Sequence, residues 1–195
     1  MPNYAMNCLI ISGDKKDIIN CVERVNNSKD NVFDLNKIKP MPDELIPDNK
    51  GNNSEQKTKK PFKHTKIKKF NLGKSIEVFF QVQKEYIEPD LYTWAINNWG
   101  TKWNTIDAEG KWLQDNTYKF LFDTAWTAPI EALSHLSKDY PKLTFSLETI
   151  EPLNRFAIEA KWHNGELLNM NEYYSLSDDY RRIYVDMLGE APEEE

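Results

Sequence analysis

The chain has 195 residues, of which 39% are hydrophobic and 12% aromatic, which is enough for one domain with a buried core. Its net charge is −6, but residues 57–69 contain seven lysines and no acid, so subtracting these seven charges leaves −13 on the remainder. An acidic body argues against a general nucleic-acid coat protein. No apolar run reaches the ~18 residues that span a bilayer, and the first residues lack a signal-peptide pattern. We therefore expect a cytoplasmic protein, with no membrane partner.

The two cysteines, Cys8 and Cys21, are too few to form a disulfide framework. We expect both to be buried, reduced thiols, as is usual in the cytosol.

The first part of the chain predicts one strand and one helix. Residues 4–12 are apolar on both faces, which indicates a central strand covered on two sides. Asp14 is placed to cap a helix over 15–26, where apolar residues recur on one face. We expect a short strand or extended edge over Val32–Ile38, and one helical turn over Met41–Leu45.

Prolines and a polar, lysine-rich stretch follow, and they predict an insertion over residues 40–100 within a single domain, 1–195. We expect a flexible lysine-rich loop over 48–74 and helices over 75–99. The stretch 75–86 fits a helix or a strand, and the helix is favoured. The last of these helices should end at Gly100, a position typical of left-handed backbone.

The residues after Gly100 predict a hairpin with strands 102–109 and 117–126. Thr127 is placed to cap the next helix, which should end at Asp139. Alternating apolar residues from Leu143 predict a further strand.

Residues 155–189 predict a C-terminal hairpin and helix. Asn164-Gly165 is a strong tight-turn signal, and Gly189 follows the last apolar helical residue. The predicted order is β-α-β, an insertion, β-β-α-β, then the hairpin and helix. This predicts an α+β, ferredoxin-like split β-α-β antiparallel sheet, whose second face the extra elements could cover.

Several motifs are similar to one known family. They are Met1-Pro2-Asn3 with Asn7-Cys8-Leu9-Ile10-Ile11-Ser12-Gly13, Pro40-Met41-Pro42-Asp43-Glu44-Leu45, Trp99-Gly100-Thr101-Lys102-Trp103-Asn104, Phe122-Asp123-Thr124-Ala125-Trp126, and Leu143-Thr144-Phe145-Ser146-Leu147-Glu148 with Glu151-Pro152. In this order, over residues 1–165, they resemble the YubB-type ferredoxin-like family of phage and plasmid genomes. The resemblance implies a ferredoxin-like fold and a mobile-element origin, and therefore the cytoplasm of a bacterial host cell. It brings no catalytic residues.

Trp99, Trp103 and Trp126 have two interpretations. They could form a stacking platform for bases, with Lys102 on a phosphate. Alternatively, because large aromatic rings usually build cores, they clamp the inserted helix onto the hairpin, and this is favoured. The expected structural motif comprises Trp99, Gly100, Trp103, Asp123 and Trp126.

Asp107 and Asp123 are predicted on neighbouring strands, where two carboxylates could hold Mg²⁺ for nuclease chemistry. The sequence offers no further ligand, so we expect Asp123 to accept hydrogen bonds from Thr101 or a backbone donor instead. None of His64, His135 and His163 has a partner at metal-ligand spacing. We predict neither a metal nor a cofactor.

The lysine-rich segment is either a phosphate-binding arm or a solvated loop. The residues predicted to bind nucleic acid or a partner are Lys57, Lys59, Lys60, Lys63, Lys66, Lys68, Lys69 and Lys102. His64 lies among these lysines, and RNA cleavage would require a histidine near neutral pKa beside cations. A nuclease would therefore use His64, Lys102 and Asp123.

The leading hypothesis is a non-enzymatic binding protein of a phage or other mobile element. It would occupy a host or defence protein, with a CRISPR effector ribonucleoprotein as the example, by charge complementarity to a basic channel. The first alternative is a small RNA nuclease that truncates structured or guide RNA. The second is an accessory module for phage DNA metabolism. The enzyme question stays open, with the binder favoured.

Overall fold

The computed structural model describes residues 3–27, 31–46, 90–175 and 177–192. Their elements, in chain order, are β1 (Tyr4–Ser12), α1 (Lys15–Val25), α2 (Leu35–Ile38), the 3-10 turn η1 (Asp43–Leu45), α3 (Leu91–Trp99), β2 (Ile106–Gln114), β3 (Thr117–Ala125), α4 (Ile130–Asp139), β4 (Thr144–Glu151), β5 (Phe156–His163), β6 (Glu166–Tyr174) and α5 (Asp178–Leu188). The loop predicted over 48–74 and the helix-or-strand question at 75–86 lie outside the described residues. No helix within the described ranges is both long and apolar enough to cross a membrane.

The strands form one six-stranded antiparallel sheet in the order β2-β3-β1-β4-β5-β6. Within it, β1-α1-β2-β3-α4-β4 repeats the β-α-β-β-α-β connectivity of a ferredoxin-like domain. The hairpin β5-β6 extends the sheet beyond β4. The α+β ferredoxin-like prediction is confirmed, and β1 lies in the interior of the sheet as its two apolar faces indicated.

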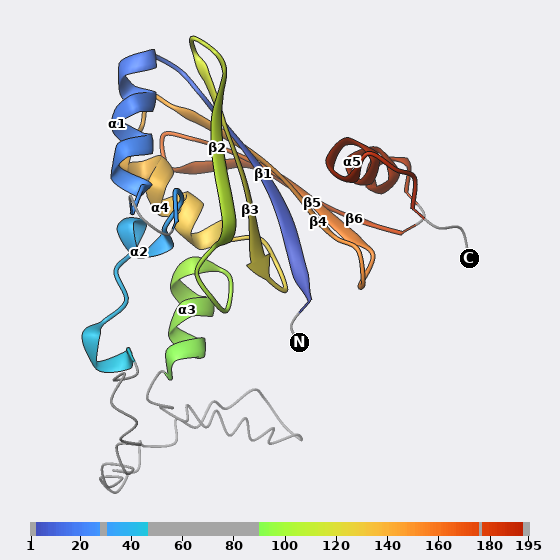
Figure 1. Ribbon diagram of the computed structural model, residues 1–195, viewed down its shortest axis with the longest axis horizontal. Helices are drawn as coiled ribbons and strands as arrows, with labels where there is room; N and C mark the ends of the chain where they lie inside the picture. Colours follow the sequence, from blue (N-terminus) through green and yellow to red (C-terminus); the bar gives the residue numbers. More distant parts are fainter. Residues whose placement is uncertain (1–2, 28–30, 47–89, 176, 193–195) are drawn as a thin grey trace, which may run out of the picture.

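Helices cover the two faces of the sheet unequally. Figure 1 shows α1, α2 and α4 on one face and α5 alone on the other. We call the first the helix face and the second the open face. The main core lies under the helix face, where the fully buried large side chains include Phe33, Phe120, Leu133, Leu136, Phe145 and Trp162.

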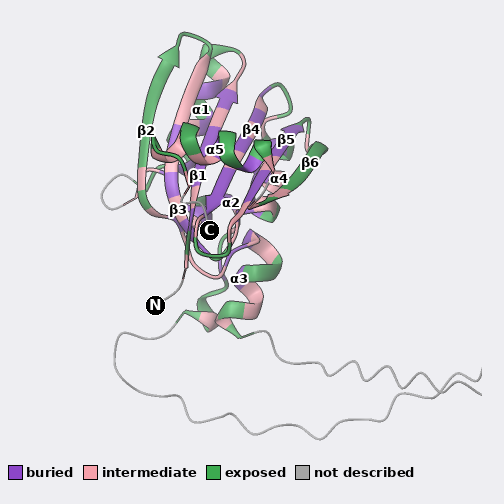
Figure 2. Cartoon of the chain, turned by 90° about the vertical axis from the view of Figure 1, so that its right-hand side faces the viewer, coloured by how far each residue is buried: buried purple, intermediate pink, exposed green. Residues whose placement is uncertain are grey.

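Helix α5 covers only part of the open face. It builds a second, smaller cluster from Tyr180 and Ile183, which pack on Ile150 of β4 and Ala157 of β5. Figure 2 shows α5 lying across this face of the sheet, with long exposed stretches on the edge strands β2 and β6. The prediction that an extra element covers the second face is therefore confirmed for the part next to α5.

The strand or extended edge predicted over Val32–Ile38 is wrong at its second half, which forms helix α2. The reason is local: Asp34 caps the helix by accepting a hydrogen bond from the backbone amide of Asn36. Leu35 and Ile38 then lie one turn apart and are both buried.

The predicted bounds of one strand and the start of one helix are also wrong. Strand β2 spans Ile106–Gln114 and not 102–109; it begins late because Asn104 and Thr105 are held by hydrogen bonds to Leu35 and Phe33, at the start of α2. Helix α4 begins at Ile130, and its N-cap is Pro129 without a side-chain hydrogen bond. Thr127 does not cap it; the carbonyl of Thr127 instead accepts a hydrogen bond from the Thr124 hydroxyl.

Candidate binding surface on the open face

The motif from Trp99 to Asn104 is architectural. The Trp99 indole is 3% exposed and donates from Nε1 to the Lys39 carbonyl at 2.9 Å. Gly100 ends α3 with φ +85°. The Asn104 side chain donates to Asp34 at 2.7 Å and accepts from the Leu35 amide at 2.8 Å. These contacts join α3 and the start of β2 to the α2 segment.

The other two tryptophans of the predicted motif lie in different surroundings. Trp126 is 46% exposed and has φ +73°, so it does not share the buried position of Trp99. Trp103 is half-buried. Lys102 lies over the Tyr92 ring at 4.5 Å and over the Trp103 ring at 5.8 Å. Among the described aromatic pairs, none joins two of these three indoles.

Asp123 and Asp107 do lie near one another, on adjacent strands. Ile106 is the register partner of Asp123, and Asp107 sits in the irregularity that follows, with φ +49°. Burial, and then the nearby Asp107, raise the pKa of Asp123. The expected hydrogen bond from Thr101 is absent from the described contacts; its hydroxyl donates to the Ala125 carbonyl at 2.9 Å.

The histidines and cysteines fall in separate places. His64 and the lysines of residues 57–69 lie outside the described residues. Burial is the main cause that lowers the pKa of His135, and it raises the pKa of Cys21 to about 12. Cys8 and Cys21 are both buried free thiols, as predicted. Within the described ranges, no three His, Cys, Asp or Glu side chains converge as a metal site would require.

The most organised polar surface is the open face beyond α5, where strand register aligns side chains into rows. The lysine row runs across all six strands, and its members are Lys111, Lys119, Ile10, Ser146, Lys161 and Asn169. Lys111 and Lys119 are direct register partners. No ion pair involves either of them, or Lys161, within the described part of the chain.

Two residues further toward α5 lies the carboxylate row, whose members are Glu109, Leu121, Cys8, Glu148, Glu159 and Asn171. Glu148 and Glu159 are direct partners, an arrangement that repels. Arg182 of α5 bridges both and offsets part of this repulsion: Nη1 lies 3.1 Å from Glu148, and Nη2 pairs with Glu159. The hydrogen bonds to the two carboxylates raise the pKa of the Arg182 guanidinium, and the bond to Glu148 contributes most.

On the other side of the lysine row lies the hydroxyl row, made of Gln114, Thr117, Ser12, Thr144, His163 and Glu166. It contains one acid, at the β6 edge. The Thr144 hydroxyl and the His163 Nδ1 lie 3.2 Å apart, which ties β4 to β5 on this face.

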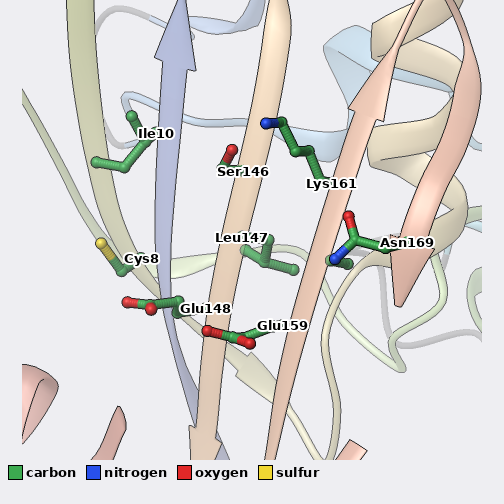
Figure 3. Close-up of a pocket in the computed structure, with 9 residues that line it drawn as sticks. Cys8, Ile10, Ser146, Leu147, Glu148, Glu159, Lys161 and Asn169 are labelled. Carbon is green, nitrogen blue, oxygen red and sulfur yellow. The ribbon is translucent and has the colours of Figure 1, made fainter. Parts of the chain in front are cut away.

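Two hollows coincide with the lysine and carboxylate rows. The larger, about 370 Å³, is lined by residues that include Cys8, Glu148, Glu159, Lys161 and Asn169. Figure 3 shows its two carboxylates side by side, with Lys161 pointing toward Ser146. The smaller, about 50 Å³, lies between β2 and β3 beside Lys111 and Lys119. Burial is the main cause that raises the pKa of the Cys8 thiol on the floor of the larger hollow.

A second surface, acidic and apolar, wraps around the β6 edge onto both faces of the sheet. The register places Leu167, Met170 and Glu172 on the helix face, whereas α5 lies on the open face. Its exposed acids are Glu166, Glu172, Asp178, Asp179, Asp186 and Glu190. Its exposed apolar side chains are Leu167, Leu168, Met170, Tyr174 and Val185. The only bases in residues 166–192 are Arg181 and Arg182. We call this the acidic surface.

Comparison with known proteins gives a family model and one solved structure. The model described as "Ferredoxin-like domain in Api92-like protein" matches residues 98–179, less than half of the chain. The crystal structure of a protein api92 from Yersinia pseudotuberculosis is 17% identical, with a TM-score of 0.40. That match covers 43% of this chain and 30% of the api92 chain. No curated protein matches.

The matched segment is ferredoxin-like. It runs from the end of α3 through β6 into the start of α5. The family model therefore agrees with the fold class that the resemblance implied. The narrower YubB-type relationship and the mobile-element origin stay predictions.

Sequence reasoning missed the lysine row. Lys119 and Lys161 are visible in the sequence as the outward residues of alternating strands. Their alignment with Lys111 depends on the order β2-β3-β1-β4-β5, which brings together strands far apart in the chain. The sequence could have shown only that these lysines point to the same side of their own strands, because the strand order decides which of them align.

Proposed function

We propose that this protein works by binding another macromolecule through its acidic surface. The observation that carries this proposal is the combination found at β6, where four large apolar side chains and two acids, Glu166 and Glu172, are exposed on the last strand of the described sheet. Leu168 and Tyr174 are 55% and 62% exposed. Strand edges and exposed apolar patches rimmed by charge are common features of protein interfaces.

The charge of the surface selects the kind of partner. The acidic surface has six exposed acids and only two arginines, and one of these, Arg182, already forms ion pairs with Glu148 and Glu159. Such a surface complements a basic groove of the kind that holds nucleic acid, and charge complementarity speeds association and rejects acidic competitors. We therefore propose a host or defence protein as partner, with a CRISPR effector ribonucleoprotein as the first candidate. The mobile-element origin suggested by the sequence motifs supports this choice.

The test is binding of purified, guide-loaded effectors to the immobilised protein over a salt titration. Wild type should bind at low salt and be released as salt screens the charges. The variant Glu166→Lys/Glu172→Lys/Glu190→Lys should bind at least about tenfold more weakly, since each reversed contact costs on the order of 1 kcal/mol.

The matched control reverses three exposed acids elsewhere, Glu23→Lys/Asp43→Lys/Glu44→Lys. It has the same net charge as the test variant and should bind like wild type. Equal losses in both variants, or no binding of wild type at low salt, would contradict the proposal.

The nuclease alternative rests on one observation, the raised pKa of Asp123 beside Asp107. Perturbed carboxyl groups are common at catalytic sites. Incubation of the protein with labelled guide RNA, with and without EDTA, separates the two functions. Specific cuts that Asp123→Asn abolishes would favour the nuclease, while intact RNA together with an inhibited effector would favour the binder.

A further inference from the structure

We propose that the lysine row and the hydroxyl row together bind the sugar-phosphate backbone of a single-stranded nucleic acid, laid across the strands of the open face. This goes beyond the proposed function, because both the surface and the class of ligand differ. The acidic surface lies on β6 and α5, whereas these two rows run from β2 to β6 and share only Glu166 with it.

The first step is the uncompensated charge. Like charges on direct cross-strand partners are destabilising, and Lys111 and Lys119 are such a pair. The corresponding pair of acids, Glu148 and Glu159, is bridged by Arg182, which offsets part of their charge. The Lys119 ammonium contacts the Cys8 thiol, whose pKa is raised, and no acid within the described residues forms an ion pair with either lysine. The two ammonium groups are therefore available to an external anion.

The second step is the chemistry beside the lysines. The hydroxyl row adds Ser12, Thr117 and Thr144, all half-buried, and the exposed imidazole of His163. Hydroxyl, ammonium and imidazole groups are the side-chain donors that phosphate oxygens accept from in protein–nucleic acid contacts. The rows lie about 7 Å apart along the strands, so one strand of phosphates can contact both.

The third step is size and shape. Six strands at a spacing of about 4.8 Å give a track of roughly 24 Å, enough for about four nucleotides of an extended strand. Apart from His163, neither row contains an aromatic side chain on which a base could stack. Recognition is therefore of the backbone, and it is independent of sequence.

The fourth step is the direction that the carboxylate row imposes. Glu109 lies on the α5 side of the lysines, with Glu148 and Glu159 beyond it. These acids repel phosphate, while the hydroxyl row contains only Glu166 at its far end. The backbone is thereby placed between the lysine and hydroxyl rows, away from α5.

The experiment measures binding of the full chain to fluorescent uridine and thymidine oligomers of about twelve nucleotides, at roughly 50 to 200 mM salt. The test variant is Lys111→Ala/Lys119→Ala/Lys161→Ala. Because each phosphate contact to a single strand contributes about −0.7 to the slope of log affinity against log salt, the three substitutions should flatten the slope by about 2. Similar affinity for the two oligomers indicates that phosphates alone are read, and tighter uridine binding indicates added contacts from the hydroxyl row to the ribose; both support the proposal.

The charge-matched control is Lys16→Ala/Lys37→Ala/Lys138→Ala, on exposed positions of α1, α2 and α4. It removes the same three charges and leaves residues 57–69 unchanged, as the test variant does. It should keep the wild-type slope. Equal slopes in the test variant and this control would overturn the proposal, as would absence of binding to both oligomers.

A second measurement locates the strand without substitutions. Lysine acylation read by mass spectrometry should show that either oligomer protects Lys111, Lys119 and Lys161. Protection confined to residues 57–69 would overturn the proposal. Neither result bears on the acidic surface, so failure here and failure of the proposed function are separate outcomes.

Discussion

At the residue scale, a few side chains fix how the chain enters the sheet. Gly100 takes φ +85° at the end of α3 in a crowded place, where an added Cβ would lie 2.8 Å from the Ile130 backbone nitrogen. Asp34, Asn104 and Thr105 then exchange hydrogen bonds between two segments about seventy residues apart. These contacts show that the Trp99–Asn104 motif joins distant segments of the fold.

Gly100→Ala should destabilise the protein by about 2–4 kcal/mol, because a left-handed backbone and a steric conflict are both imposed. Gly189→Ala is the matched control, since Gly189 has φ +77° with nothing within 4 Å of an added Cβ. It should cost only about 1 kcal/mol. Urea unfolding of the two variants measures the difference in their free energies of unfolding. Equal losses of stability would contradict the prediction, because the residues around Gly100 would then accommodate a Cβ without strain.

Asp123→Asn should stabilise the protein at neutral pH. The raised pKa of Asp123 means that the folded state holds its proton more tightly than the unfolded state. Its ionisation therefore costs stability as pH rises above the ordinary aspartate pKa of about 3.9. Urea unfolding at neutral pH and near pH 3 should show the advantage of the variant shrinking at the lower pH; an advantage that is constant with pH would contradict this.

At the element scale, α5 is held by an apolar cluster and by one cation. Tyr180 and Ile183 pack on Ile150 and Ala157. Arg182 bridges Glu148 and Glu159, and Asp186 lies 3.6 Å from its Nη1. The arginine therefore reduces the repulsion between two strands and attaches the helix that covers them.

Arg182→Ala should lower the free energy of unfolding by about 1–2 kcal/mol, a modest value because the side chain is 41% exposed. The cost should shrink in a Glu148→Gln/Glu159→Gln background, where no carboxylate pair needs neutralising. Urea unfolding of wild type, of each variant and of the combined variant completes a double-mutant cycle. Amide hydrogen exchange in α5 shows whether the helix stays packed on the sheet. An unchanged cost in the Gln background would show that Arg182 acts through packing alone.

At the scale of the whole molecule, the sheet divides the protein into two unlike halves. The helix face is sealed by α1, α2 and α4, and it contains most of the core. The open face is sealed only near α5, so its remaining rows meet solvent. The two proposed surfaces follow from this asymmetry: one at the β6 edge with α5, the other on the rows that α5 leaves uncovered.

The sequence by itself determined the local elements wherever one physical signal dominated. Apolar residues on both faces identified β1, and apolar alternation identified β4. Asn164-Gly165 indicated the β5-β6 turn, and the glycines at 100 and 189 marked helix ends, because these signals act over a few neighbouring residues. It misplaced the start of β2, where Asn104 bonds to a partner distant in the chain.

Only the tertiary structure decided which strands are neighbours, and therefore which side chains meet. Lys111 and Lys161 share a row, and Arg182 reaches Glu148 and Glu159, because antiparallel pairing fixes a register between segments tens of residues apart. That register depends on the packing of the whole core against the helix face. The composition sets how many charged side chains this protein has, and the fold determines which of them lie together on a surface.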